Sequence, residues 1–404
     1  MIIRARVVVT MDGEPIENGA VAILGEQIAQ VGKWREFFPT ANDEVFDLGD
    51  HVILPGLINA HCHLDYTMLR GAIPPPNSFT AWIQAINACK ATLTRADYLH
   101  SIETGLRESA KFGTTTIANL EAFPELIGEV ATVPMRTWWL AEMIDVRAPV
   151  AVEKVLTEME ARARPPGGVG LAPHAPFTVS ENLYRAAADL AARHGIPITT
   201  HLAESRNEMT MFRDGQGSLF DFMQSIGRPM DDCGRETPLA LMVRRGLLDA
   251  RWLVAHLNEL TPSDFELLEQ APRFHIVNCP RSHAYFGHAP FPYARLRSLG
   301  FNICLGTDSL ASTDDLSLFS EMRRCRGTIP ISSVREILEM VTTSAAAALG
   351  EGDRLGRLRA GYGADMIALP FSGPVADALE GILAFEGSVP WRMVNGERTG
   401  VTNE

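Results

Sequence analysis

The sequence predicts an α/β protein in which a (β/α)₈ barrel of the TIM type is accompanied by a small β-sandwich domain formed by both chain ends. Eight short apolar runs lie between residues 52 and 309, and stretches with helical period separate them, as parallel βαβ units require. Both chain ends lack that helical period. The 404 residues also fit, because such a barrel commonly occupies about 200 to more than 400 residues.

The two chain ends have the composition of short β segments. IIRARVVVT and GAVAILGEQIAQVG near the start combine β-branched and apolar residues, and Asp-Gly and Gly-Glu turns bound them. β character returns after residue 350 with RLGRLRAGYGADMIALP and PWRMVNGERTG. We therefore expect residues 1–53 and 352–404 to form one composite β-sandwich domain, and residues 54–351 to form the barrel.

The middle of the chain alternates between strand and helix candidates. The eight predicted strands are VILPGLINA, TTTIANL, MRTWWLAEM, VGLAPHA, IPITTHLAE, WLVAHLNEL, FHIVNCP and NICLGTDS. The predicted helices include YLHSIETGLRESAKFG, PVAVEKVLTEMEARAR, ENLYRAAADLAARHG, PLALMVRRGLLD, PSDFELLEQA and FPYARLRSLG. Several of these end in glycine, as helix C-termini often do. Eight strands favour a closed barrel, and an open doubly wound sheet is the structural alternative.

Composition and charge exclude several classes of protein. The net charge of −13 argues against nucleic-acid binding, because an acidic surface repels phosphate backbones. No apolar run approaches the ~18 residues of a membrane span, so we expect no membrane association. The six cysteines include no C-x-x-C pair, and the first residues do not resemble a signal peptide. These features indicate a cytoplasmic protein with reduced thiols.

Residues that can bind a metal follow the predicted strands. The C-terminal ends of barrel strands converge on one face, which is the catalytic face of such barrels. His61 and His63 close the first strand, and their i, i+2 spacing points both side chains the same way. Two imidazoles on one face are a natural metal half-site. Strands four, five, six and eight end, in that order, in His174, His201, His256 and Asp308.

Glu204 lies three residues after His201, where the chain turns over the barrel mouth. A carboxylate there can move a proton between water and substrate without being a metal ligand. Each of these residues also has a structural interpretation, since a lone buried histidine usually belongs to the core and Asp308 could cap a helix. The ordered set at five strand ends favours a functional site.

The motifs around these residues resemble the amidohydrolase superfamily over nearly the whole chain. They are PGLINAHCH, HLAES, VAHLNEL, NCPRSH, LGTDSLAS and AGYGADMIAL. The chain is similar in particular to the branch that contains cytosine deaminase, guanine deaminase, adenosylhomocysteine deaminase and the triazine hydrolases. The resemblance implies that one divalent metal ion, zinc before iron, is bound by His61, His63, His201 and Asp308. It also implies that Glu204 is the proton shuttle and that His256 holds the attacking water or polarises the developing oxyanion.

Two details refine the resemblance. No lysine follows Lys154, so the lysine-bridged binuclear site of some relatives is not expected, and His174 is expected to contact substrate. Dechlorinating relatives tend to lose the glutamate after the fifth-strand histidine. Glu204 is present and favours displacement of an amine, because leaving ammonia must be protonated.

Other candidate substrate contacts come from segments that depart from the usual pattern. PRSHAYFGH places His283 and His288 where relatives often have asparagine and a small residue. The proline-containing segment LDYTMLRGAIPPPNSFTAWIQ, which includes Trp82, suggests a stiff lid over the pocket. Arginines such as Arg70 and Arg136 could bind a carboxylate or ribose, although a salt bridge is an alternative use for each.

The predicted function is metal-dependent hydrolytic deamination of an amino-substituted nitrogen heterocycle, such as a purine base or nucleoside, with release of ammonia. One alternative is hydrolysis of a cyclic amide, N-alkylamine or carbon–chlorine bond of a heterocycle. Another is a non-catalytic relative that kept the fold and its metal site. A Rossmann-type oxidoreductase lacks support, because no G-x-G-x-x-G follows an early strand. Many members of the superfamily are dimers, so the resemblance allows a homodimer.

Overall fold

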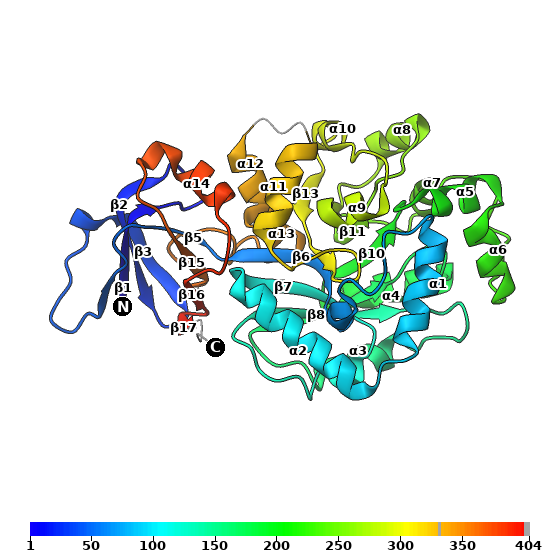
Figure 1. Cartoon of the computed structure of the whole chain (residues 1–404), viewed down its shortest axis with the longest axis horizontal. Helices are drawn as coiled ribbons and strands as arrows, with labels where there is room; N and C mark the ends of the chain where they lie inside the picture. The colour runs from blue at the N-terminus through cyan, green and yellow to red at the C-terminus, as the bar shows by residue number, and fades with distance from the viewer. Residues whose placement is uncertain (330–332, 400–404) are drawn as a thin grey trace.

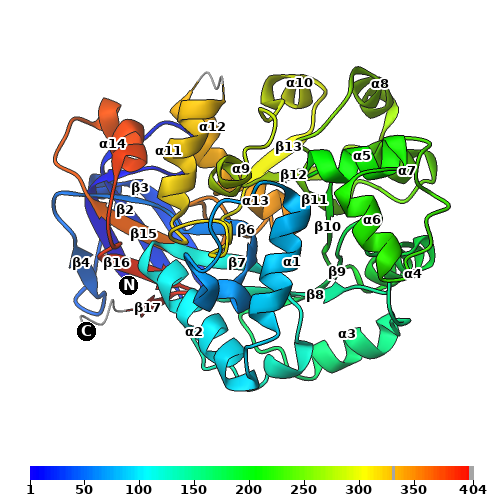
Figure 2. The same cartoon turned by 45° about the vertical axis from the view of Figure 1, so that its right-hand side comes forward.

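The computed structural model describes residues 1–329 and 333–399 and contains two β-sheets, each at one side of the molecule (Figure 1). The larger sheet is a ring of parallel strands surrounded by helices (Figure 2). The smaller sheet joins strands from both ends of the chain. The predicted fold class is confirmed, and the barrel rather than the open doubly wound sheet is the architecture. No described helix has the length and apolar character needed to cross a membrane.

The barrel strands follow one another around the ring in chain order. They are β6 (Leu57–His63), β7 (Thr114–Glu121), β8 (Arg136–Met143), β9 (Gly167–Pro173), β10 (Ile198–Leu202), β11 (Trp252–His256), β12 (His275–Asn278), β13 (Asn302–Leu305) and β14 (Asp308–Ser309). β13 and β14 are two parts of the eighth strand. The ring closes where Asp308 of β14 pairs with Cys62 of β6.

Helices follow most of the barrel strands. They are α1 (Phe79–Lys90), α2 (Arg95–Lys111), α3 (Val152–Glu160), α4 (Glu181–His194), α5 (Arg206–Asp214), α6 (Ser218–Ser225), α7 (Pro238–Arg244), α8 (Pro262–Gln270), α9 (Pro280–Phe286), α10 (Tyr293–Ser298), α11 (Leu318–Thr328), α12 (Val334–Met340), α13 (Thr343–Ala348) and α14 (Ala378–Ala384). Short 3₁₀ helices are η1 (Trp34–Glu36), η2 (Leu64–Leu69), η3 (Pro124–Leu126) and η4 (Val375–Asp377). The six predicted helices are present as α2, α3, α4, α7, α8 and α10.

The smaller sheet consists of β1 (Ile2–Val8), β2 (Ile16–Leu24), β3 (Gln27–Lys33), β4 (Val45–Asp47), β5 (His51–Pro55), β15 (Met366–Pro370), β16 (Trp391–Val394) and β17 (Glu397–Thr399). The chain ends meet where β15 pairs antiparallel with β5. The predicted domain limits stay a prediction, and residues 330–332 and 400–404 within them lie outside the described residues.

One predicted strand is divided. The run 52–60 contributes its first half to β5 and its second half to β6, so that it links the two sheets. The division falls at Gly56, whose N–H donates to the carbonyl of Asp365. A Cβ at Gly56 would lie 2.1 Å from the Thr115 side chain, so only glycine fits this crossing.

The barrel interior explains why the catalytic face is polar. Inward-facing apolar side chains form a buried cluster that includes Ile58, Ala118, Leu140, Leu253, Ala255 and Val277. In the register of β10 and β11, His201 is the partner of Ala255. His201 therefore faces the barrel interior at the level of Ala255, near the C-terminal ends of the two strands.

Candidate metal-binding active site

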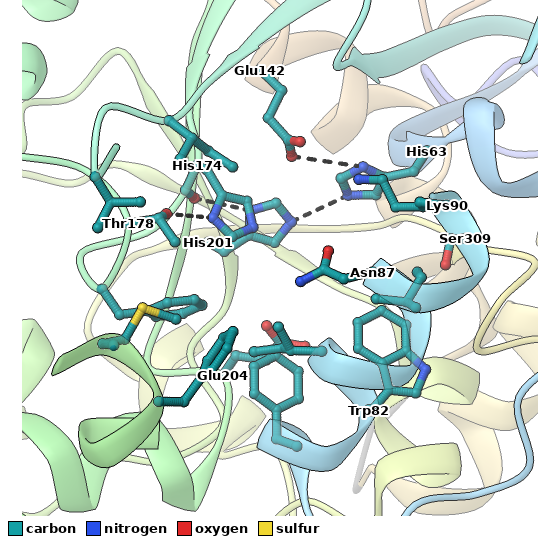
Figure 3. A pocket seen from close by; sticks show the side chains of 18 of the residues that line it. His63, Trp82, Asn87, Lys90, Glu142, His174, Thr178, His201, Glu204 and Ser309 are labelled. Carbon is teal, nitrogen blue, oxygen red and sulfur yellow. Dashed lines mark hydrogen bonds and ion pairs between the residues drawn. The ribbon is translucent and has the colours of Figure 1, made fainter. Parts of the chain in front are cut away.

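The predicted site residues of strands one, four, five, six and eight lie together at the C-terminal face of the barrel (Figure 3). Seven non-glycine residues of the described chain have positive φ. Four of them lie at these strand ends and are Ala203 (φ 50°), His256 (φ 77°), Leu257 (φ 51°) and Asp308 (φ 57°). Such backbone strain persists only where the surrounding structure maintains it, and it concentrates at functional sites.

Three histidines and one aspartate form the centre of the site. His61, His63 and His201 each offer a ring nitrogen, and these atoms lie within 4.8 Å of one another. The Nε2 atoms of His63 and His201 are 3.2 Å apart. Oδ1 of Asp308 lies 3.9 Å from Nε2 of His61 and 4.0 Å from Nε2 of His63. Imidazole and carboxylate donors of this number suit zinc or a similar divalent ion.

The hydrogen bonding of the histidines fits a metal ion. His61 is fully buried, and within the described residues neither ring nitrogen has a hydrogen-bond partner. Burial lowers the pKa of His61 and of His201 to about 3, so both rings are neutral. Nδ1 of His201 lies 2.9 Å from the carbonyl of His174. A carbonyl can only accept, so Nδ1 donates and the Nε2 lone pair faces the cluster.

Asp308 is oriented by the residues around it. Its Oδ2 accepts a hydrogen bond from the hydroxyl of Ser282 at 2.5 Å, and its Oδ1 accepts one from the backbone N–H of Ser309 at 2.8 Å. Burial raises the pKa of Asp308, while the hydrogen bond from Ser282 acts in the opposite direction. The carboxylate is therefore held in place at the edge of the histidine cluster.

Glu204 lies in a turn after β10 that Glu208 stabilises. The buried Glu208 carboxylate accepts the backbone N–H groups of Ala203 at 3.2 Å and of Glu204 at 2.8 Å. Oε2 of Glu204 lies 3.8 Å from Nε2 of His256. Burial, with the charges of Asp308 and Glu208, raises the pKa of Glu204 well above its ordinary value. A carboxyl with a raised pKa can act as a general acid near neutral pH.

His256 and His174 complete the polar floor. Burial and the neighbouring His201 and His61 lower the pKa of His256, so its ring is neutral. Nδ1 of His174 lies 2.6 Å from the hydroxyl of Thr178, which itself donates to a backbone carbonyl. The Thr178 oxygen therefore accepts from Nδ1, and the Nε2 lone pair of His174 is free for another donor.

A cavity of about 680 Å³ opens above this floor. Its remaining wall is mostly apolar and includes Tyr66, Phe79, Trp82, Ile83, Ile86, Phe177, Phe222, Met223, Ile226 and Phe286. The predicted lid segment forms η2 and α1, and Trp82 of α1 lines the cavity. A mostly apolar cavity with a few convergent polar groups is typical of a small-molecule site.

The sequence prediction missed Glu142, which lies near the end of β8. Its Oε1 is 3.9 Å from Nδ1 of His63, and its carboxylate groups with His174 and His201 within 4.8 Å. A polar residue near a strand end was the signal used for the other site residues. Applied to WWLAEM, the same signal would have found Glu142.

Lys90 and Tyr66 were also missed. Nζ of Lys90 donates to the Tyr66 hydroxyl at 2.7 Å, and the Tyr66 ring stacks on His63 with centroids 5.5 Å apart. Both residues line the cavity. Their contact depends on how α1 packs on η2, and no local sequence pattern predicts it.

Three residues predicted to contact substrate do not line this cavity. Arg136 is the first residue of β8, so it lies at the opposite end of the barrel, where its guanidinium binds Asp365 at 3.0 Å. Arg70 forms an ion pair with Glu108 and does not line the cavity. His283 lines a separate cavity and does not line the one above the histidine cluster.

Comparisons with known proteins agree with the motifs. Residues 52–395 match the model of the amidohydrolase family. The 5-methylthioadenosine/S-adenosylhomocysteine deaminase of Syntrophobacter fumaroxidans is 30% identical over 90% of this chain and 82% of the relative. The aminodeoxyfutalosine deaminase of Deinococcus radiodurans is 29% identical over 77% of both chains.

A solved structure extends the likeness to three dimensions. An adenosine deaminase from Xanthomonas campestris, crystallised with bound zinc, superimposes with a TM-score of 0.84. It is 25% identical, and the match covers 100% of this chain and 93% of the other. The family match and the three-histidine cluster together support a divalent metal ion in the site. The match over most of the sequence confirms the predicted resemblance, and the chain belongs to the amidohydrolase family.

Proposed function

We propose that this protein is a hydrolytic deaminase, which replaces the amino group of an adenine-type ring by oxygen and releases ammonia. The observation that carries the proposal is the buried carboxyl of Glu204, which lies beside His256 on the floor of the cavity. Expulsion of ammonia requires a proton donor at the reacting ring. The two relatives described above are named as deaminases of adenine-type nucleosides, which supports the same reaction here.

The residues that would hold the metal ion are His61, His63, His201 and Asp308. Zinc in the Xanthomonas campestris structure supports zinc rather than iron. When bound, such an ion supplies a Lewis acid that lowers the pKa of water toward about 7.

Each protein group has one proposed role in the reaction. Glu204 takes a proton from the attacking water and delivers it to the ring nitrogen next to the carbon that bears the amino group. His256 stabilises the new oxygen on that carbon. Asp308 accepts the second proton of the water and returns it to the departing amino group, which leaves as ammonia. The water oxygen stays on the ring, and no other reactant is needed.

The size and character of the cavity favour a nucleoside over a free base. A cavity of about 680 Å³ exceeds the needs of a purine, and its outer wall is apolar. His174 and Trp82 would contact the substrate from two sides. The proposal includes a cytoplasmic protein that binds neither nucleic acid nor membrane and acts as a homodimer.

The test is ammonia release by zinc-loaded protein from a panel of adenine nucleosides, guanine, pterins, cytosine and aminotriazines, with Glu204→Gln as the control. Ammonia from one class, absent with the control protein, would support the proposal and identify the substrate. A ring-opened acid, an alkylamine or chloride as the product would establish one of the alternative hydrolyses instead. Stoichiometric metal with no product from any compound would indicate a binding role.

A further inference from the structure

A second cavity of about 370 Å³ lies beside the site and has its own wall. Asn278 at the end of β12, His283 of α9, His288 and Arg324 of α11 are among its lining residues. Exposed residues of α9 and α11 also line it, so it opens to the surface. The substrate cavity and this second cavity share no lining residue.

The end of α9 fixes the position of His288. Gly287 adopts a left-handed conformation with φ 65°, and the backbone N–H of His288 donates to the carbonyl of His283 at 3.2 Å. This is the hydrogen bond of a Schellman turn, which reverses the chain at a helix C-terminus. The His288 ring then stacks on Phe286, with centroids 5.2 Å apart. His288 is thereby held between the two cavities, since Phe286 lines the substrate cavity.

Glu204 lies between two imidazoles. Nε2 of His288 is 3.9 Å from Oε1 of Glu204, and Nε2 of His256 is 3.8 Å from Oε2. Both distances exceed a hydrogen bond, as is common for catalytic groups before substrate binds. His256 lines the substrate cavity and His288 lines the second one. Each carboxyl oxygen of Glu204 therefore faces a different imidazole.

Buried polar atoms around the second cavity lack partners. Within the described residues, Nε2 of His288, Nε2 of His283 and both amide atoms of Asn278 make no hydrogen bond. Buried polar groups normally have partners, and a cavity of this size has room for water. The titratable and charged groups near His288 include Glu204, His283, Arg206 and His256. Burial, with His283 and Arg206, lowers the pKa of His288 to about 3, so the ring is neutral and carries one hydrogen that it can donate.

We propose that His288 is a positioning residue for Glu204. It donates a hydrogen bond from Nε2–H to one carboxyl oxygen of Glu204, which keeps the other oxygen facing His256 and the substrate, free to take and deliver a proton. His283 and the second cavity connect this pair to solvent by a route that bound substrate does not block. The inference rests on the proposed role of Glu204 in deamination.

The first test compares His288→Leu, which cannot donate the hydrogen bond, with His288→Gln, whose amide N–H can. We expect kcat of the leucine variant to fall about 10- to 100-fold, as for other residues that orient a catalytic group, with KM within about twofold. The glutamine variant should recover most of the loss. The matched control is His194→Leu, since His194 is an exposed residue at the end of the outer helix α4, where its Nδ1 lies 3.6 Å from Oε1 of Glu160. Unchanged kcat in the leucine variant, or equal losses in both variants at equal melting temperature, would overturn the proposal.

The second test does not depend on turnover. Zinc-loaded full-length protein labelled with ¹⁵N in its histidine rings is compared with its Glu204→Gln variant, with His288→Gln used to assign the His288 signal. We expect the Nε2 resonance of His288 to move and that of His194 to stay. An unmoved His288 resonance would overturn the proposal. A moved resonance in a protein that releases no ammonia from any heterocycle would support the contact and overturn only the proposed function.

Discussion

The two ends of the barrel both bury charged and polar side chains, but these side chains differ in their hydrogen bonding. At the N-terminal end, the Arg136 guanidinium makes hydrogen bonds of 3.0 to 3.1 Å with both oxygens of Asp365, and Arg392 donates to the carbonyl of Thr114 at 3.1 Å. At the C-terminal end, His61 has no hydrogen-bond partner among the described residues. The hydrogen bonds of Arg136 and Arg392 hold the barrel to the smaller sheet, whereas the unpartnered His61 lies where the metal ion is proposed to bind.

Backbone conformation also differs between the C-terminal face and the crossing to the smaller sheet. Ala203, His256, Leu257 and Asp308 have positive φ at the C-terminal face. At the other end, the crossing between the sheets uses a glycine, Gly56, where a side chain would collide with Thr115. Four of the seven described non-glycine residues with positive φ thus lie where the fold positions reactive groups.

Removal of the metal should produce the largest difference between the ends. Dialysis against a strong chelator should abolish ammonia release, because the bound ion would lower the pKa of the attacking water. Added zinc should restore the activity. The melting temperature should also fall on removal, since an ion at about a hundredfold its Kd contributes about 2.7 kcal/mol. Full activity in protein shown to be metal-free by elemental analysis would contradict the assignment of the cluster.

Glu204→Gln should have the next largest effect. The amide cannot carry the proton, so kcat should fall by about 10²- to 10⁴-fold, while zinc content and melting temperature stay near those of the wild type. The matched control is Glu160→Gln on the outer surface, which forms an ion pair with His194. Near-normal turnover in the Glu204 variant would show that another group moves the proton.

Arg136→Met should reverse the pattern, with a loss of stability and little loss of activity. The variant leaves the carboxylate of Asp365 buried and unpaired, which costs about 3 to 5 kcal/mol of unfolding free energy. Because Arg136 lies at the opposite end of the barrel, kcat and KM should stay within about twofold of the wild-type values, and ammonia assays below the melting temperature check this. A large rise in KM would restore Arg136 as a substrate contact.

The same variant makes a pH prediction. Burial already raises the pKa of Asp365, and Arg136 opposes that shift. Without Arg136 the pKa in the folded state rises further above its unfolded value, so the ionised carboxylate destabilises the variant above the unfolded pKa. The difference in melting temperature between wild type and variant should therefore shrink as the pH is lowered toward the ordinary pKa of a carboxyl. A pH-independent difference would mean that the lost ion pair is not its cause.

The sequence was informative about the C-terminal face and misleading about contacts at longer range. His61, His63, His201 and Asp308 could be predicted to converge, because parallel strands in a barrel bring their C-terminal ends together whatever the loops do. Arg136 begins its strand, and the same reasoning would have excluded it from the site. The position of a residue along its strand thus predicted whether it lies at the site better than its charge did.

The remaining differences depend on tertiary packing. His283 lies five residues before His288, yet only His288 approaches Glu204, because the turn at Gly287 reverses the chain between them. The split of the run 52–60 between two sheets depends on the contact of Gly56 with Thr115. The pair of Lys90 and Tyr66 depends on the packing of α1. None of these has a periodic signal in the chain.

Trp82→Ala should give the smallest effect and tests the apolar wall rather than the polar floor. Trp82 packs edge-on against Phe286 with centroids 5.0 Å apart, and both rings line the cavity. Loss of an aromatic contact worth about 0.5 to 1.5 kcal/mol should raise KM by up to about tenfold, with kcat nearly unchanged because no group that moves a proton is altered. Trp34→Ala is the matched control, since Trp34 stacks on Phe37 beside the smaller sheet. A fall in kcat with unchanged KM would mean that Trp82 positions the reacting ring, and the division between a polar floor that does chemistry and an apolar wall that binds would no longer hold.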